Sequence, residues 1–136
     1  MRNPTTENEN ERYDRGAAVQ DTLDPDIRHE MTESLADIAP DFARMTVEFP
    51  FGDIYSRPGL DLRSRQIATI SALCAMGAQR QLTVHLRFAR NIGITREEAV
   101  EVVMQMAVYA GWPKAMDGLR AVREAYAEEE APAPEA

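Results

Sequence analysis

The fold is decided by one stretch of the chain, residues 81–113, which reads QLTVHLRFARNIGITREEAVEVVMQMAVYAGWP. Apolar residues recur in it at intervals of three and four, which is the period of an α-helix with one buried face. Gly93 is typical of a helix end, and Thr95 with Glu98 is typical of a capping box that satisfies the backbone donors of a helix start. The stretch therefore predicts two helices joined by a tight turn, the first over residues 79–91 and the second from Thr95 to Gly111.

Helical patterns continue on both sides of this stretch. The further helices that we expect lie at residues 11–22, 26–39, 41–48, 61–77 and 113–127, with Asp61 as an N-cap. Residues 50–58 contain two prolines and Gly52, so we expect a loop or a short turn of helix there. No segment alternates apolar and polar residues as a strand does. The sequence therefore predicts an all-α fold, a compact antiparallel helical bundle.

The chain of 136 residues has the length of one domain. We expect this domain at residues 11–127, between a disordered segment at 1–10 and an acidic, proline-containing disordered tail at 128–136. The sequence contains no run of about 20 apolar residues and no apolar segment near its start. We therefore expect a cytoplasmic protein that has no membrane partner.

The composition excludes several kinds of function. The formal net charge of −8 argues against a nucleic-acid partner, because binding phosphates requires a basic face. Cys74 is the only cysteine, so no disulfide or dithiol motif can form within the chain, and its apolar neighbours indicate an inert core thiol. The two histidines, His29 and His85, are far apart and no cysteine cluster accompanies them, so we expect no metal site and no other cofactor.

His85 is the strongest candidate for catalysis. It shares a helical stripe with Leu82, Leu86 and Ala89, which places it at the buried edge of an apolar face. A histidine in such a place is either a core residue or a catalytic group, and the pattern leaves both interpretations open. Gln81 lies one turn earlier on the same face, where it either orients the ring or a ligand, or is an ordinary surface glutamine.

Three further residues are candidates for binding a substrate. Arg57, beside the turn at Pro58 and Gly59, carries a planar guanidinium suited to a carboxylate, and a solvated arginine is the alternative. Tyr55 belongs to the same segment and is assigned to the same site. Trp112 follows the glycine that ends a helix and either forms the wall of a pocket or fills the core. The expected ligand is a small-molecule carboxylate.

Three segments resemble one known family. Residues 81–113 resemble its H-x-R-x-A-x-N-x-G-[VI]-T-x-E-E core. Residues 51–73, FGDIYSRPGLDLRSRQIATISAL, resemble its aromatic-Gly-acid-Ile-aromatic-x-Arg-Pro-Gly-Leu segment with the helix that follows. Residues 12–20, RYDRGAAVQ, are similar to the N-terminal helix of its decarboxylase branch. The family is that of carboxymuconolactone decarboxylase, within the alkylhydroperoxidase-D-like superfamily, and the match covers residues 11–127.

The resemblance implies a helical bundle of the alkylhydroperoxidase-D-like type that assembles into homotrimers or homohexamers, with an active-site histidine at His85. It implies a carboxy-lyase that removes CO2, without a cofactor, from a carboxylated lactone or a β-keto-acid-like substrate. The reaction passes through an enolate that His85 stabilises and, titrating near pH 7, protonates, with Gln81 as a polar orienter. Aromatic catabolism and secondary metabolism are the pathways in which such a reaction is expected.

The chain also departs from relatives of this kind. The redox branch of the superfamily uses two thiols and a glutamate, whose positions match Ala78, Gln81 and Gln66, so peroxide reduction by a dithiol is not expected. The turn before the histidine helix and Trp112 also differ from the family pattern, which suggests a bulkier or differently charged acid. An isomerase or cyclase acting through an enolate in a natural-product pathway, and a non-catalytic helical oligomer that binds a ligand, stay open as alternatives.

Overall fold

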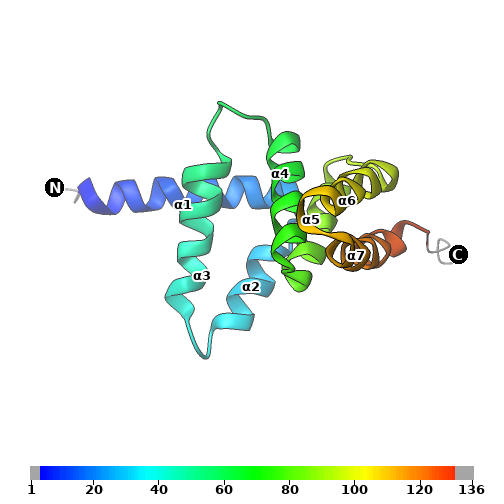
Figure 1. Cartoon of the computed structure of the whole chain (residues 1–136). Coiled ribbons are helices and arrows are strands. Elements are labelled where there is room, and N and C mark those ends of the chain that lie inside the picture. The colour runs from blue at the N-terminus through cyan, green and yellow to red at the C-terminus, as the bar shows by residue number, and fades with distance from the viewer. Residues whose placement is uncertain (1–3, 131–136) are drawn as a thin grey trace, which may run out of the picture. The chain divides into compact units, whose positions relative to one another are not determined.

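The computed structural model describes residues 4–130 (Figure 1). The predicted all-α fold is confirmed, because this range contains helices and no strand. The chain forms two compact units, residues 1–61 and 62–136. The single domain expected over residues 11–127 stays a prediction. None of the helices between residues 4 and 130 has the length and apolar character that crossing a membrane requires.

Each unit is built from consecutive helices. The first contains α1 (Pro4–Leu23), α2 (Ile27–Leu35), α3 (Pro40–Thr46) and the π-helix η1 (Val47–Tyr55). The second contains α4 (Leu62–Met76), α5 (Gln79–Asn91), α6 (Arg96–Ala110) and α7 (Trp112–Glu130). The disordered segment expected at residues 1–10 overlaps α1 from Pro4 onward, and the tail expected at 128–136 overlaps the end of α7. Residues 1–3 and 131–136 lie outside the described part of the chain.

The segment at residues 50–58, where we expected a loop or a short turn of helix, is helical as far as Tyr55. The π-helix η1 continues directly from α3 and includes both Pro50 and Gly52. A proline has no backbone N–H and its ring clashes with the preceding turn of an α-helix, and the wider π-winding relieves this conflict. The helical alternative was therefore the right one, but the helix is longer than one short turn.

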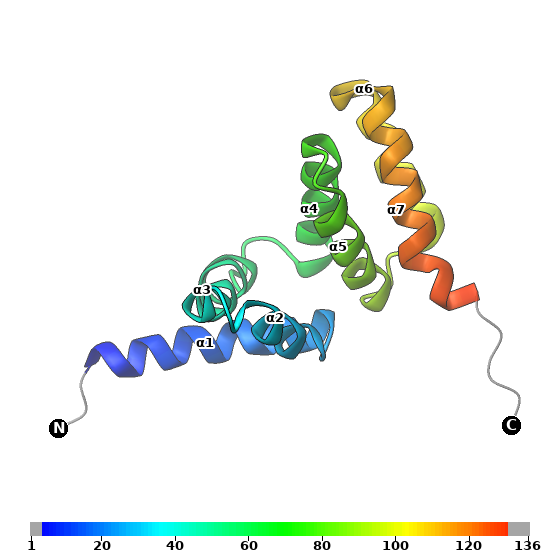
Figure 2. The same cartoon turned by 90° about the horizontal axis from the view of Figure 1, so that it is seen from below.

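Gly52 has a different role, which is to let α1 approach η1 closely. A Cβ atom at Gly52 would lie 2.3 Å from the carbonyl oxygen of Arg12, and one at Gly16 would lie 1.9 Å from that of Val47. Both distances are far below van der Waals contact, so the backbones meet where only glycine fits. Figure 1 shows α1 crossing the rod formed by α3 and η1, and Figure 2 shows α2 and α3 on the same side of α1.

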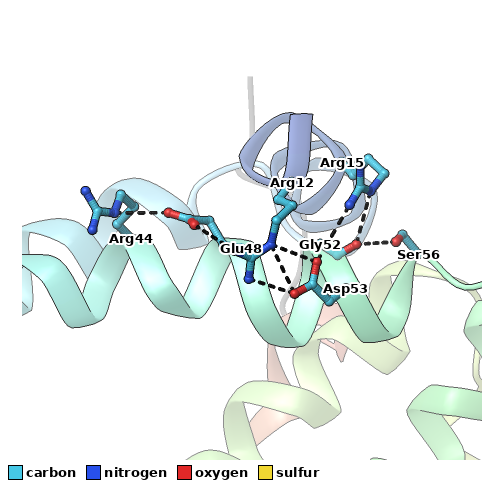
Figure 3. A network of polar contacts seen from close by, with 7 residues as sticks. All are labelled: Arg12, Arg15, Arg44, Glu48, Gly52, Asp53 and Ser56. Carbon is cyan, nitrogen blue, oxygen red and sulfur yellow. Dashed lines mark hydrogen bonds and ion pairs between the residues drawn. The ribbon is translucent and has the colours of Figure 1, made fainter. Parts of the chain in front are cut away.

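A network of hydrogen bonds and ion pairs between charged side chains stabilises this crossing (Figure 3). Arg12 of α1 donates to both carboxylate oxygens of Asp53, with N–O distances of 2.7–3.1 Å, and the hydrogen bond from Arg12 holds the pKa of Asp53 below its ordinary value. Arg15 adds a hydrogen bond to the Gly52 carbonyl. Glu48 lies 3.7 Å from Arg12 and 3.0 Å from Arg44. The Gly-acid pair of the family-like segment therefore joins two helices of the first unit.

The second unit has its own apolar core. The core side chains come from all four helices and the turn between α5 and α6, and they are Ile70, Cys74, Leu82, Leu86, Ala89, Ile94, Ala99, Val103, Ala121, Val122, Ala125 and Tyr126. Figure 2 shows α4 beside α5 and α6 beside α7, and α7 also packs against α4 and α5. The Tyr126 hydroxyl donates to the carbonyl of Ile94, which satisfies a polar group inside this core. Met76, the last residue of α4, lies outside this core and is 70% exposed.

Sharp turns set the ends of α5 and α6. Helix α5 occupies residues 79–91 as predicted, and Gly93 follows it with a φ of 92°. The predicted capping box is present: the Thr95 hydroxyl accepts from the N–H of Glu98, and the Glu98 carboxylate accepts from the N–H of Thr95. Gly111, with a φ of 100°, ends α6 as predicted. These turns therefore set where α5 ends and where α6 begins and ends.

Candidate functional site

His85 lies on α5 at the edge of the core of the second unit. The expected stripe is confirmed, since Leu82, Leu86 and Ala89 are at most 1% exposed. His85 itself is only partly exposed, and its ring meets that of Phe88 edge-on with the centroids 4.9 Å apart. The histidine is therefore neither sealed inside the core nor on the open surface.

Burial lowers the pKa of His85 from its ordinary value of 6.5 to about 4. The cause is desolvation, which penalises the charged imidazolium, and no charged side chain among the described residues offsets it. The ring is therefore neutral at pH 7. The expectation that His85 titrates near pH 7 is wrong, because the sequence pattern located the apolar face without showing how much of the ring it covers.

The residue that contacts His85 through hydrogen bonds is Gln66 of α4. Its side-chain nitrogen lies 3.0 Å from Nδ1 of the His85 ring and donates to the backbone carbonyl of His85 at 2.8 Å. Gln66 is fully buried. In the sequence, Gln66 stood out only because the redox branch of the superfamily has a glutamate at this position. Gln66 also precedes Ile70 and Cys74 at four-residue spacing, on a helix face where apolar side chains are normal. A polar residue on that face was the available sign of a buried partner.

Gln81, the predicted orienter, is an exposed residue of α5. The described contacts include no hydrogen bond between Gln81 and His85, whereas Gln66 forms two. A spacing of four residues brings two side chains to one helix face, but it does not by itself turn a polar side chain toward a half-buried neighbour. The assignment of Gln81 as an orienter of the ring or of a ligand stays a prediction.

Trp112 lies at the start of α7 and is 72% exposed, so it does not fill the core. It lines an apolar cavity of about 160 Å³ together with Met104, Ala107, Ala115, Met116 and Leu119. The assignment of Trp112 to a substrate site stays a prediction.

Tyr55 and Arg57 belong to the first unit, at the end of η1 and just beyond it. The ring of Tyr55 packs against that of Phe51, with the centroids 5.2 Å apart. Arg57 is an exposed residue, and its backbone N–H donates to the carbonyl of Ile54. Their assignment to a substrate site stays a prediction.

Cys74 is a buried core residue. Its thiol donates weakly to the Lys114 carbonyl at 3.5 Å, and burial raises its pKa, so the thiol stays protonated. Between residues 4 and 130, no group of three His, Cys, Asp or Glu side chains gathers as a metal site would require. Within the described chain, the chemically active group with the most distinctive surroundings is His85.

Comparison with known proteins identifies the family. The model of the carboxymuconolactone decarboxylase family matches residues 40–124. A 4-carboxymuconolactone decarboxylase of Acinetobacter baylyi is 32% identical over 120 residues, which cover 88% of this chain and 90% of that protein. A nitrosuccinic acid decarboxylase of Metarhizium robertsii is 30% identical over 111 residues, 79% of this chain and 76% of the relative. An uncharacterized 15.0 kDa protein of Paracoccus denitrificans is 29% identical over 117 residues, 85% of this chain and 87% of the relative. This chain therefore belongs to the carboxymuconolactone decarboxylase family.

Proposed function

We propose that this protein is a cofactor-free decarboxylase of a small carboxylated acid, and that His85 stabilises the anion formed when CO2 leaves. The observation that carries the proposal is the likeness of most of the chain to decarboxylases of two different acids. A carboxylated lactone or β-keto acid and a nitro acid share one feature: an electron-withdrawing group can accept the electron pair that CO2 leaves behind. The substrate class is therefore an acid with such an acceptor near its carboxylate.

The chemistry asks two things of the protein. As the C–C bond to the carboxylate breaks, its electron pair moves into the acceptor, and negative charge collects on an oxygen of an enolate or nitronate. A donor aimed at that oxygen lowers the barrier by about 3 to 4 kcal/mol. The carbon that lost CO2 then takes up a proton, for which water is the source in this proposal.

The surroundings of His85 suit donation of a hydrogen bond to the anionic oxygen better than protonation of the carbon. A neutral imidazole is a good hydrogen-bond donor but a very weak acid, and burial keeps His85 neutral at pH 7. Desolvation also strengthens a hydrogen bond to a developing charge. We therefore assign His85 as the donor to the anionic oxygen, and no longer as the acid that protonates the carbon.

The experiment is a CO2-release assay on purified protein with a panel of acids that includes 4-carboxymuconolactone, nitrosuccinic acid and simple β-keto acids. For the acid that is turned over, we expect His85→Ala to lower kcat/KM at least about 100-fold with the fold intact. His29→Ala is the matched control, because His29 is the other histidine and is exposed, where it pairs with Glu33.

Each other result has a defined meaning. Turnover without CO2 release would indicate the isomerase or cyclase alternative. Binding of an acid without turnover would indicate the ligand-binding alternative. A folded His85→Ala protein that decarboxylates its substrate at the wild-type rate would remove His85 from the mechanism.

A further inference from the structure

The contact between Gln66 and His85 determines which nitrogen of the histidine ring carries the proton. A side-chain amide has a nitrogen that only donates and an oxygen that only accepts, while each ring nitrogen of a neutral histidine does one or the other. Which end of the amide faces the ring therefore fixes where the ring proton lies. The second hydrogen bond of Gln66 settles the orientation of the amide.

That second bond goes to the backbone carbonyl of His85. The Gln66 nitrogen lies 2.8 Å from this carbonyl oxygen, which can only accept. If the amide were turned over, two oxygens would face each other at that distance. The turned amide would also direct both of its N–H groups to the site that its oxygen now occupies. No described residue forms a hydrogen bond with the oxygen at that site, so the two N–H groups would be buried there without an acceptor. The nitrogen is therefore the atom that faces His85.

The ring nitrogen facing this donor must accept. The Gln66 nitrogen lies 3.0 Å from Nδ1 of His85, so Nδ1 carries its lone pair toward α4 and has no proton. In a neutral ring the proton then resides on Nε2. One amide group thus uses its two N–H bonds on two acceptors of the same histidine, which holds both the ring and its backbone in place.

We propose that Gln66 is a positioning residue that locks His85 in the tautomer with its proton on Nε2, so that the ring offers a neutral N–H donor to an anionic oxygen of the reacting molecule. The link to turnover rests on the proposed function, whereas the tautomer itself does not. The lock has a chemical consequence. A proton on Nδ1 would face the N–H groups of Gln66 and be repelled by them. Because the imidazolium carries a proton on both ring nitrogens, the contact that selects Nε2–H also opposes formation of the imidazolium.

The tautomer is measured directly by ¹⁵N NMR of the full chain, labelled at histidine, at about pH 7. We expect Nδ1 of His85 to have the chemical shift of an unprotonated ring nitrogen and Nε2 that of a protonated one. The reference for a ring that exchanges between both tautomers is free histidine in its neutral form. A protonated Nδ1 in His85 of the wild-type protein would overturn the proposal without any variant.

Two variants test whether Gln66 causes the preference. Gln66→Met keeps the length of the side chain but removes its donors, so we expect the shifts of His85 to move toward the averaged values of neutral free histidine. Gln66→Glu presents acceptors instead, so we expect Nδ1 of His85 to become protonated. If Gln66→Met folds and leaves the Nε2–H signature of His85 unchanged, Gln66 does not set the tautomer. If neither variant folds, the wild-type spectrum still decides which nitrogen is protonated.

Turnover separates this inference from the proposed function. With an identified substrate, we expect Gln66→Met to lower kcat by about 10- to 100-fold while KM changes little, because the lost element orients another group and does not bind the acid. Loss of activity without a change in the NMR signature would mean a structural role and would contradict the lock. If no acid is decarboxylated at all, the proposed function fails, and the NMR result stands or falls on its own.

Discussion

Burial of His85 makes the stability of the fold depend on pH. The folded chain holds this ring at a pKa of about 4, below the 6.5 of an ordinary histidine, so the unfolded chain takes up the proton first as the pH falls. The contribution is complete above about pH 6.5 and is lost as the pH falls toward 4, which amounts to about 3 kcal/mol. We expect wild-type protein to lose this much more unfolding free energy between pH 7 and 4 than His85→Gln does.

The measurement is urea unfolding of both proteins at several pH values in that window. Carboxylates such as Asp53, whose pKa is also lowered, weaken the fold at acid pH too, but they contribute equally to both proteins. His29→Gln provides a matched control and should follow the wild-type curve. Parallel curves for wild type and His85→Gln would mean that the ring is not desolvated in the folded chain.

At the scale of single residues, the sequence predicted His85 as a candidate but not its hydrogen-bond partner, Gln66. The apolar stripe of α5 identified His85, because helical spacing alone determines which side chains share a face. Gln66 belongs to another helix, and its contact with His85 depends on how α4 and α5 are aligned along each other. Spacing within one helix cannot supply that alignment, so the hydrogen bonds between Gln66 and His85 could not be predicted from the sequence.

At the scale of helices, the crossing of α1 and η1 depends on two glycines. An alanine at Gly52 would place its methyl group 2.3 Å from the Arg12 carbonyl oxygen, and the two backbones would have to separate. We expect Gly52→Ala and Gly16→Ala each to destabilise the first unit by roughly 1 to 3 kcal/mol. The readout is the helical circular dichroism signal followed through urea unfolding.

Gly59→Ala is the control for this prediction. A Cβ atom at Gly59 meets no heavy atom within 4 Å, so the added methyl group should leave the unfolding midpoint unchanged or raise it slightly. Equal midpoints for Gly52→Ala and Gly59→Ala would show that α1 and η1 do not approach as closely as described. Loss of stability in both would point to the glycine backbone instead of the crossing.

The capping box at the start of α6 permits a second test at this scale. Thr95→Ala removes the acceptor for the Glu98 N–H, which we expect to lower stability by about 1 kcal/mol. Thr32→Ala is the matched control, because its hydroxyl is exposed and only bonds the Arg28 carbonyl one turn earlier. Thr32→Ala should leave stability unchanged or raise it. Equal losses in the two variants, measured by urea unfolding, would assign the effect to threonine itself and not to the cap.

Helix boundaries were predictable where local chemistry sets them. The limits of α5 and the start of α6 depend on Gly93, Thr95 and Glu98, which act within one turn. The length and the winding of η1 were not predicted, because Pro50 and Gly52 are tolerated there for reasons outside the segment: continuity with α3 and the close approach of α1. A breaker residue predicts a loop only when nothing in the tertiary structure favours a helix.

At the scale of the whole molecule, apolar side chains remain exposed along α6 and α7. Val108, Tyr109 and Trp112 are each more than 70% exposed, and Trp112 shares the apolar cavity with Met104 and Met116. Exposed apolar groups gathered in this way are typical of interaction surfaces. The sequence shows which residues are apolar but not what covers them, so this surface could not be predicted from it.

We predict that these residues of α6 and α7 bind further copies of the chain, in the homotrimer or homohexamer that the family resemblance implies. Light scattering at micromolar concentration should give at least three times the 15.2 kDa of one chain. Val108→Asp places a charge on this surface and should reduce the mass toward one chain, because burying an unpaired carboxylate is strongly unfavourable. Trp112, the only tryptophan, should then shift its fluorescence to longer wavelength as its indole meets water. Thr32→Asp, on exposed α2, is the control and should keep the wild-type mass. A wild-type protein with the mass of one chain would show that these side chains do not bind another copy.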